Sequence, residues 1–187
     1  DWEAAELAKA GHSFAAFQLK FRPEDEVVAA VGDAEALVVN MVKITDSLLA
    51  RLPRCRLIIR HGIGYDNVDV NACTRRNILF VYQPDYCIED VAEHAIALIF
   101  ACARKIVASR KTLEESSRAG QWDFSRLFPL YRMKGKTLGV IGAGRIGGTL
   151  ILRMKSFGFR ILACDPYLTE QRKAELGVPF VDHDTIF

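Results

Sequence analysis

Short apolar runs alternate with helical patterns along the first half of the chain. Runs with the length and β-branched content of buried strands occupy residues 14–19, 36–40, 56–60 and 78–82. Between them, apolar residues recur with the spacing of amphipathic helices over 2–9, 24–31, 45–52 (with Thr45 as a candidate cap) and 67 or 69 to 76. Strands that alternate with helices are typical of a parallel sheet, so the pattern predicts an α/β fold.

A longer helical pattern begins near residue 89 and continues to about 117. Its apolar face consists of Val91, Ala95, Leu98, Ile99, Cys102 and Ile106. An aromatic segment at 120–135 precedes a strand at 136–141, a helix at 146–157 and a strand at 160–164. We expect two α/β units linked by the long helix, whose apolar face packs either within the subunit or against a second copy. The aromatic segment favours a homodimer, because exposed aromatic side chains are costly in a monomer.

The composition is that of a soluble globular protein. Half of the 187 residues are apolar and 26% are charged, and 25 basic against 23 acidic residues leave a net charge of +2. So small a charge does not favour a nucleic-acid partner. The longest apolar stretch, 95–103, is too short to cross a bilayer, and no signal peptide is visible. We expect a cytoplasmic protein with no membrane partner.

The cysteines and histidines lack the spacing of metal ligands. The five cysteines are widely separated, none are paired as C-x-x-C, and the four histidines form no cluster with them. An odd number of cysteines, mostly in apolar runs, indicates buried free thiols in a reducing compartment rather than a disulfide framework. We expect no metal site.

The segment from Gly142 to Gly147 (GAGRIG) stands between a predicted strand and a predicted helix. Gly142 allows a sharp turn off the strand, Gly144 allows the backbone to approach a pyrophosphate, and Gly147 allows close packing of the helix on the sheet. The helix N-terminus then offers N–H groups and a partial positive charge to the phosphates. The spacing and its flanks predict a dinucleotide site.

Asp165 follows the second strand of this predicted unit. A carboxylate at this place accepts hydrogen bonds from the adenosine ribose hydroxyls and repels a 2′-phosphate. Taken alone, Asp165-Pro166 also fits a simple strand-ending turn. The glycine loop upstream favours the cofactor interpretation, and the expected cofactor is NAD rather than NADP.

Three stretches carry a likeness to a known family: residues 60–69 (RHGIGYDNVD), 90–94 (DVAEH) and 135–167 (from GKTLG through the glycine loop to DPY). In them the chain resembles the D-isomer-specific 2-hydroxyacid dehydrogenase family. Residues 84–87 (PDYC) look most like the branch of phosphoglycerate-dehydrogenase-like enzymes and C-terminal-binding-protein corepressors. The resemblance implies a flavodoxin-like substrate-binding domain at 1–88, with its first strand missing, and the first part of a Rossmann NAD-binding domain at 89–187.

The resemblance also implies that the backbone N–H groups of Gly62, Ile63 and Gly64 receive the substrate carboxylate. A glycine-rich turn after a parallel strand exposes amides at the carboxyl end of the sheet, where α/β ligands bind. A tight turn that needs glycine for its dihedral angles explains these residues equally well.

Further cofactor contacts are implied by the same resemblance. Arg145 and Ile146 match the pair that touches the pyrophosphate and covers the cofactor. Gln83 and Val91 match positions that approach the nicotinamide side.

No catalytic residue is expected within this chain. Reduction of a 2-keto acid needs a cation to polarise it and a general acid tuned by a carboxylate. The resemblance implies that the family's arginine, glutamate and histidine lie beyond Phe187. His61 and His94 do not occupy that histidine's place, and we expect His94 to be a packing or hydrogen-bonded helix residue. These residues are therefore expected to be an inactive portion of a longer protein.

The implied function is that of an NAD-dependent oxidoreductase that interconverts a 2-keto acid and a D-2-hydroxy acid by hydride transfer. Two alternatives stay open: an NAD(H)-responsive corepressor-type binding protein of the same fold, and an inactive remnant. Many 2-hydroxy acids share the carboxylate that the turn would hold, so the expectation concerns the substrate class alone.

Overall fold

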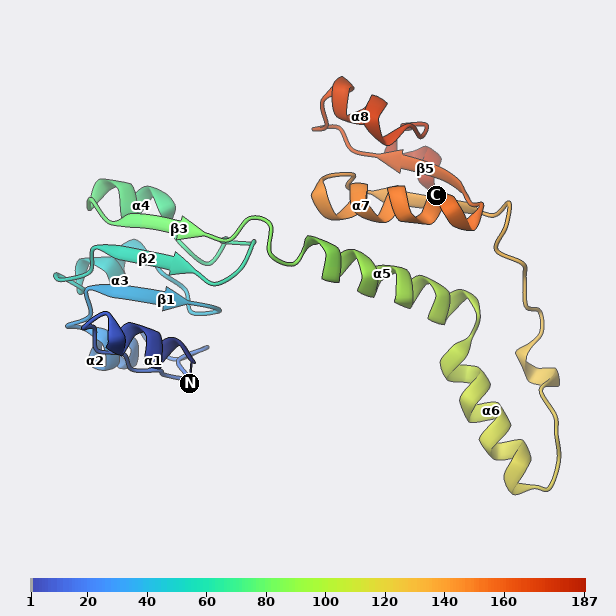
Figure 1. The fold of residues 1–187 in the computed structure, drawn as a ribbon, viewed down its shortest axis with the longest axis horizontal. Coiled ribbons are helices and arrows are strands. Elements are labelled where there is room, and N and C mark those ends of the chain that lie inside the picture. The colour runs from blue at the N-terminus through green and yellow to red at the C-terminus, as the bar shows by residue number, and fades with distance from the viewer. Residues whose placement is uncertain (1) are drawn as a thin grey trace. The chain divides into compact units, whose positions relative to one another are not determined.

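The computed structural model describes residues 2–187, and the chain divides into two compact units, Asp1–Tyr86 (unit 1) and Cys87–Phe187 (unit 2). Each unit contains parallel strands with helices beside them, which confirms the predicted α/β class (Figure 1). The division falls just before the boundary expected between residues 88 and 89.

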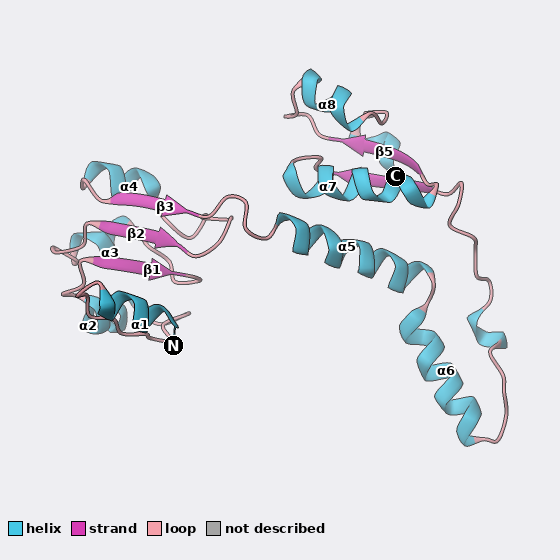
Figure 2. Cartoon of the chain, in the orientation of Figure 1, coloured by secondary structure: helices cyan, strands magenta, loops and turns pink. Residues whose placement is uncertain are grey.

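Unit 1 contains three parallel strands in the order β1-β2-β3, which lie side by side in Figure 2. They are β1 (Ala36–Val39), β2 (Leu57–Arg60) and β3 (Leu79–Tyr82). The helices are α1 (Trp2–Lys9), α2 (Glu24–Val31), α3 (Asp46–Ala50) and α4 (Val70–Arg75). Val39, Arg60 and Tyr82 align at the carboxyl ends of the strands, so the segments that follow them begin at one edge of the sheet.

One face of this sheet forms the core of unit 1. Leu37 and Ile58 are buried there together with apolar side chains from α2, α3 and α4. Successive strand residues point to opposite faces, and on the other face Val38, Leu79 and Val81 are exposed. Within residues 2–86, the predicted buried strands are therefore buried on one face only.

The prediction of a strand at residues 14–19 is wrong. This segment has no regular structure, and Phe17 is exposed. A strand needs a neighbour that pairs with its backbone, and among the described residues β1 pairs only with β2. Local apolar content alone does not supply that partner.

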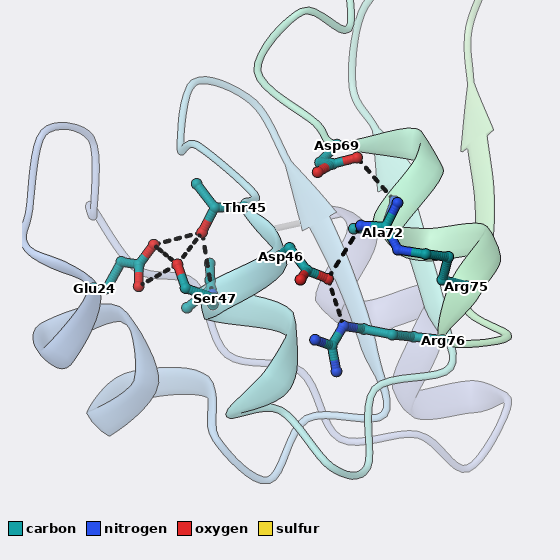
Figure 3. A network of polar contacts seen from close by, with 9 residues as sticks. Glu24, Thr45, Asp46, Ser47, Asp69, Ala72, Arg75 and Arg76 are labelled. Atoms are coloured by element: carbon teal, nitrogen blue, oxygen red, sulfur yellow. Dashed lines mark hydrogen bonds and ion pairs between the residues drawn. The ribbon is translucent and has the colours of Figure 1, made fainter.

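Side-chain caps begin two helices of unit 1, and Figure 3 shows them from close by. Thr45 Oγ1 accepts a hydrogen bond from Leu48 N–H at 3.1 Å, which confirms it as the cap of α3, and it also contacts Glu24. Asp69 Oδ1 accepts a hydrogen bond from Ala72 N–H at 2.8 Å at the start of α4. Such caps satisfy N–H groups that the first turn of a helix leaves unpaired.

Unit 2 is built on the parallel pair β4 (Thr137–Ile141) and β5 (Arg160–Cys164), which α7 (Arg145–Met154) and the short η2 (Lys155–Phe157) connect. Helix α5 (Ile88–Ala103) packs against α7. Helix α8 (Glu170–Leu176) is followed along the chain by α9 (His183–Ile186), which packs against both strands. The buried core comprises Ala92, Val140, Ala143, Leu150, Ile151, Met154, Ile161, Ala163 and Leu176. This core supports the loop between β4 and α7.

The long helix predicted over 89–117 is in fact two helices, α5 and α6 (Ile106–Arg118). Between them Lys105 adopts a left-handed φ of 54°, and its Nζ donates a hydrogen bond to Leu127 O at 2.8 Å. Ala95 and Ile99 of the predicted apolar face do pack against the core, but Leu98 is exposed. The helical spacing of apolar residues continues across the break, because this spacing depends on the order of side chains and not on the direction of the backbone.

Candidate functional site

The glycine loop joins β4 to α7 in unit 2. Gly142 has a φ of +84°, in the left-handed region that favours glycine, and its N–H donates a hydrogen bond to Cys164 O at 2.9 Å. A Cβ at Gly147 would lie 1.9 Å from Gly142 O. The fold itself therefore requires glycine at both positions.

Gly144 stands in a different environment. Its φ is −63°, and an added Cβ would meet no described atom within 4 Å. Gly144 is also the N-cap of α7, and no side chain among residues 2–187 caps the first turn of this helix. Neither a left-handed φ nor packing within the described residues explains the glycine. The open space beside an uncapped helix N-terminus is suited to an anion.

Asp165 lies beside this loop. Its Oδ2 accepts a hydrogen bond from Ala143 N–H at 2.9 Å, and its Oδ1 accepts one from Tyr167 N–H at 3.0 Å. A strand-ending turn explains the bond to Tyr167 but not the bond to the loop. Each carboxylate oxygen can accept more than one hydrogen bond, so the fixed carboxylate retains capacity for a further donor.

The Gly62–Gly64 turn follows β2 in unit 1. Neither glycine has a φ in the left-handed region, so a left-handed φ does not explain the glycines of this turn. A Cβ at Gly62 would lie 2.6 Å from Nη1 of Arg60, whereas a Cβ at Gly64 would meet no described atom within 4 Å. Ile63 between them is half-buried. Gly62 makes room for a guanidinium group, and Gly64 leaves the turn open.

Arg60 is a candidate site residue that the motifs did not single out. Its Nη1 donates hydrogen bonds to His61 O at 2.6 Å and Asn40 Oδ1 at 3.3 Å. Its Nε is buried and has no partner among the described residues. Guanidinium groups pair strongly with carboxylates, so an arginine directly before an amide-rich turn was the signal in the sequence.

The remaining predicted cofactor residues lie in both units. Gln83 N–H donates a hydrogen bond to Gly62 O at 3.4 Å, which places the segment after β3 beside the turn of unit 1. Val91 lies on α5 of unit 2 and is exposed. Arg145 and Ile146 begin α7 directly after Gly144, with Arg145 exposed and Ile146 half-buried. The nicotinamide contacts of Gln83 and Val91 stay predictions.

Metal ligands, membrane spans and disulfides were sought within residues 2–187. No group of three or more His, Cys, Asp or Glu side chains there could hold a metal ion, and no helix has the length and apolarity to cross a bilayer. All five cysteines are free; burial raises the pKa of the Cys55 and Cys73 thiols, whereas Cys102 is exposed. His94 is exposed on α5 and has no hydrogen bond among the described residues, so the expected packing role is wrong.

The sequence and the fold are similar to those of known dehydrogenases. A family model described as D-isomer specific 2-hydroxyacid dehydrogenase, catalytic domain, matches residues 2–181. The D-3-phosphoglycerate dehydrogenase of Mycobacterium bovis is 39% identical over 163 residues, covering 87% of this chain and 30% of that protein. The glyoxylate reductase of Thermococcus litoralis is 33% identical over 174 residues, covering 89% of this chain and 51% of that protein.

A solved structure extends the likeness. The D-lactate dehydrogenase of Aquifex aeolicus, complexed with NAD and lactic acid, superposes with a TM-score of 0.72 at 30% identity, covering 89% of this chain and 47% of that one. The chain thus spans between about a third and a half of the length of these relatives. Because the family model matches nearly all described residues, the chain belongs to the D-isomer-specific 2-hydroxyacid dehydrogenase family.

Proposed function

We propose that the protein is an NAD-dependent oxidoreductase that interconverts a 2-keto acid and a D-2-hydroxy acid by hydride transfer. The observation that carries this proposal is the loop of unit 2, where Gly144 is open beside an uncapped helix and Asp165 is bonded to Ala143 N–H. The open helix N-terminus suits a pyrophosphate, and the carboxylate suits ribose hydroxyls while disfavouring a 2′-phosphate. The NAD bound to the Aquifex aeolicus relative supports this assignment.

The cofactor is assigned to the residues predicted from the sequence. The proposed set is Gly142, Gly144, Arg145, Ile146, Gly147 and Asp165, with Gln83 and Val91 on the nicotinamide side. Bound NAD accepts or supplies the hydride. The amides at the start of α7 bind the phosphates, the Arg145 guanidinium adds positive charge there, and Ile146 covers the cofactor from solvent.

The substrate carboxylate is assigned to unit 1. The N–H groups of Gly62, Ile63 and Gly64 offer donors, and Arg60 adds a positive charge against the same turn. Small 2-keto and 2-hydroxy acids are the proposed substrates, in keeping with the names of the phosphoglycerate and glyoxylate relatives. The proposal places the general acid, with the arginine and glutamate that accompany it, outside residues 2–187, so this portion alone is inactive.

A homodimer is also part of the proposal. Helix α6 has no buried residue, and Trp122, Phe128 and Tyr131 of the following segment are exposed. Hydrogen bonds from Arg104 and Lys105 to backbone oxygens of this segment hold it in place. A fixed surface that exposes several aromatic side chains is suited to a second copy. The five free thiols support a reducing, cytoplasmic location.

Binding and turnover test the main proposal separately. Quenching of tryptophan fluorescence would measure the affinities of NADH and NADPH, and loss of NADH absorbance would measure reduction of pyruvate, glyoxylate and their hydroxylated or phosphorylated homologues. We expect tighter binding of NADH than of NADPH by this chain, and turnover of at least one keto acid by a longer protein that contains both these residues and the general acid. In that longer protein, NADH binding without turnover would instead support the corepressor-type binding protein. Absence of NADH binding would overturn the cofactor assignment.

A further inference from the structure

A chain of polar contacts leads to Arg60 from the loop after β1. Asn40 follows directly on β1, and its Oδ1 accepts the hydrogen bond from Nη1 of Arg60 at 3.3 Å. Asn67 Nδ2 in turn donates hydrogen bonds to Asn40 O at 3.2 Å and to Val42 O at 2.7 Å. The guanidinium group at the end of β2 is thereby connected to two asparagines.

The backbone around Asn40 is itself fixed. Ile44 N–H donates a hydrogen bond to Asn67 O at 2.7 Å, and Asp69 N–H donates one to Ile44 O at 2.8 Å. Ile44 is buried, so this pairing lies at the edge of the core. Asn67 thus binds the loop through both its side chain and its backbone. These bonds fix the backbone from which the Asn40 side chain extends.

Arg60 needs such a support because its other contacts fix only part of its guanidinium group. Nη1 is shared between His61 O and Asn40 Oδ1, Nε is buried without a described partner, and the guanidinium group lies against Gly62. Nη2 has no hydrogen bond within the described residues. A guanidinium group held through Nη1 alone can present Nη2 to an anion at the turn.

We propose that Asn40 is a positioning residue for the anion site at the Gly62–Gly64 turn, which it serves by holding Arg60 against Gly62. The proposal rests on the proposed function, because it presumes that this turn receives the substrate carboxylate. The neutral amide is essential to it. An aspartate at this position would form an ion pair with Arg60 and cancel the charge that attracts the substrate, whereas asparagine orients the guanidinium group without neutralising it.

The test uses oxamate, an unreactive analogue of a 2-keto acid, whose affinity for the protein in the presence of NADH is measured by isothermal titration calorimetry. Asn40→Ala removes one hydrogen bond and should weaken oxamate binding by about 3- to 10-fold. Asn40→Asp, which keeps the size and the acceptor, should weaken it by at least about 10-fold while the thermal unfolding midpoint stays level or rises. Asn71→Ala, at an exposed position on α4, is the matched control and should bind oxamate normally.

A double-mutant cycle separates positioning from a general structural role. Once Arg60→Met has removed the guanidinium group, adding Asn40→Ala should weaken oxamate binding no further. An equal loss in both backgrounds would overturn the proposal, as would normal oxamate affinity in Asn40→Ala and Asn40→Asp. If the unsubstituted protein binds NADH but not oxamate, the substrate assignment of the proposed function fails and this inference fails with it.

Discussion

Each unit carries a glycine-containing turn at the carboxyl end of a parallel strand, but the glycines answer different demands. In unit 2, Gly142 is left-handed and a Cβ at Gly147 would collide with backbone oxygen. In unit 1, neither glycine of the turn is left-handed, and the nearest atoms to a Cβ at Gly62 would be those at the end of the Arg60 side chain. In the loop of unit 2, an added side chain would therefore collide with fixed backbone atoms. In the turn of unit 1, it would collide with a side chain that can move.

One glycine in each turn is unexplained by either demand. Gly144 and Gly64 have no described atom within 4 Å of an added Cβ, and neither has a left-handed φ. Open space at the carboxyl end of a parallel strand is where ligands of α/β proteins bind. The comparison thus separates glycines that form the turn from glycines that leave room beside it, and substitutions can test that separation.

The largest effect is expected from Gly147→Ala. The added Cβ at 1.9 Å from Gly142 O forces the backbone of the loop or of α7 to shift, which should destabilise unit 2 by about 3 kcal/mol and abolish NADH binding. Thermal unfolding and hydrogen exchange of the unit 2 peptides would measure the loss. Gly148→Ala, at the next residue of α7, is the comparison variant: its Cβ would lie 3.1 Å from the flexible end of Arg172 and 3.3 Å from Ala143 O, so it should cost less than the 1.9 Å contact at Gly147. Equal costs would contradict the distinction between rigid and movable neighbours.

Gly144→Val should separate binding from folding. Because no described atom lies within 4 Å of the added Cβ, the unfolding midpoint should change little, while the valine extends into the space assigned to the pyrophosphate and weakens NADH binding by about 100-fold or more. Fluorescence titration would measure the affinity, and hydrogen exchange would check that unit 1 stays folded. Retained NADH affinity would show that the loop is only a turn.

The elements were predictable wherever a local pattern determined them. The β4 strand, the glycine loop and the β5 strand lie where the apolar runs placed them, and Thr45 caps α3 as predicted. The segment 14–19 was not predictable in this way, because a strand depends on a partner that its own residues do not specify. The break at Lys105 was missed because the apolar spacing continues across it, and the contact of Lys105 with Leu127 joins residues far apart in sequence.

The candidate site shows the same division. Spacing alone indicated Gly142, Gly144 and Gly147. Gly142 and Gly147 answer local steric demands of the loop, whereas Gly144 leaves open space beside it. The contact of Asp165 with Ala143 needed the two strands to pair, and the place of Arg60 over Gly62 needed the side-chain conformation. Strand pairing and side-chain conformation depend on the whole fold. The motifs therefore indicated Asp165 as a candidate but did not indicate Arg60.

Asp165→Ala should weaken NADH binding by about 10-fold and reduce the preference for NADH over NADPH. The loss has two parts: the ribose acceptor disappears, and Ala143 N–H loses the partner that helps to fix the loop. Parallel titrations with both cofactors would measure it. Asp184→Ala, at an exposed carboxylate of the same unit, is the control. Unchanged affinities for both cofactors in Asp165→Ala would contradict the assignment.

Gly62→Ala tests the movable neighbour in unit 1. The added Cβ would lie 2.6 Å from Nη1 of Arg60, which can rotate away, so the cost in stability should be below about 1 kcal/mol, far less than for Gly147→Ala. The displaced guanidinium group should nevertheless weaken oxamate binding by about 3- to 10-fold. Calorimetry would measure the affinity and thermal unfolding the stability. A large loss of stability would mean that Arg60 is as immobile as the backbone of the other loop.

The smallest effect on stability is expected from Asp46→Asn, which changes a contact between two helices of unit 1. Asp46 Oδ1 accepts a hydrogen bond from Arg76 Nε at 2.9 Å, which joins α3 to α4 (Figure 3) and lowers the pKa of the exposed Asp46 carboxyl. A carboxyl whose pKa is lower in the folded state stabilises that state above its unfolded pKa, and the contribution disappears as the pH falls through the folded pKa. Asp46→Asn should therefore lower the unfolding midpoint of unit 1 slightly at neutral pH and make it less dependent on pH on the acid side. Oxamate and NADH affinities at neutral pH should not change; a change in oxamate affinity would show that the turn of unit 1 depends on this joint as well as on Arg60.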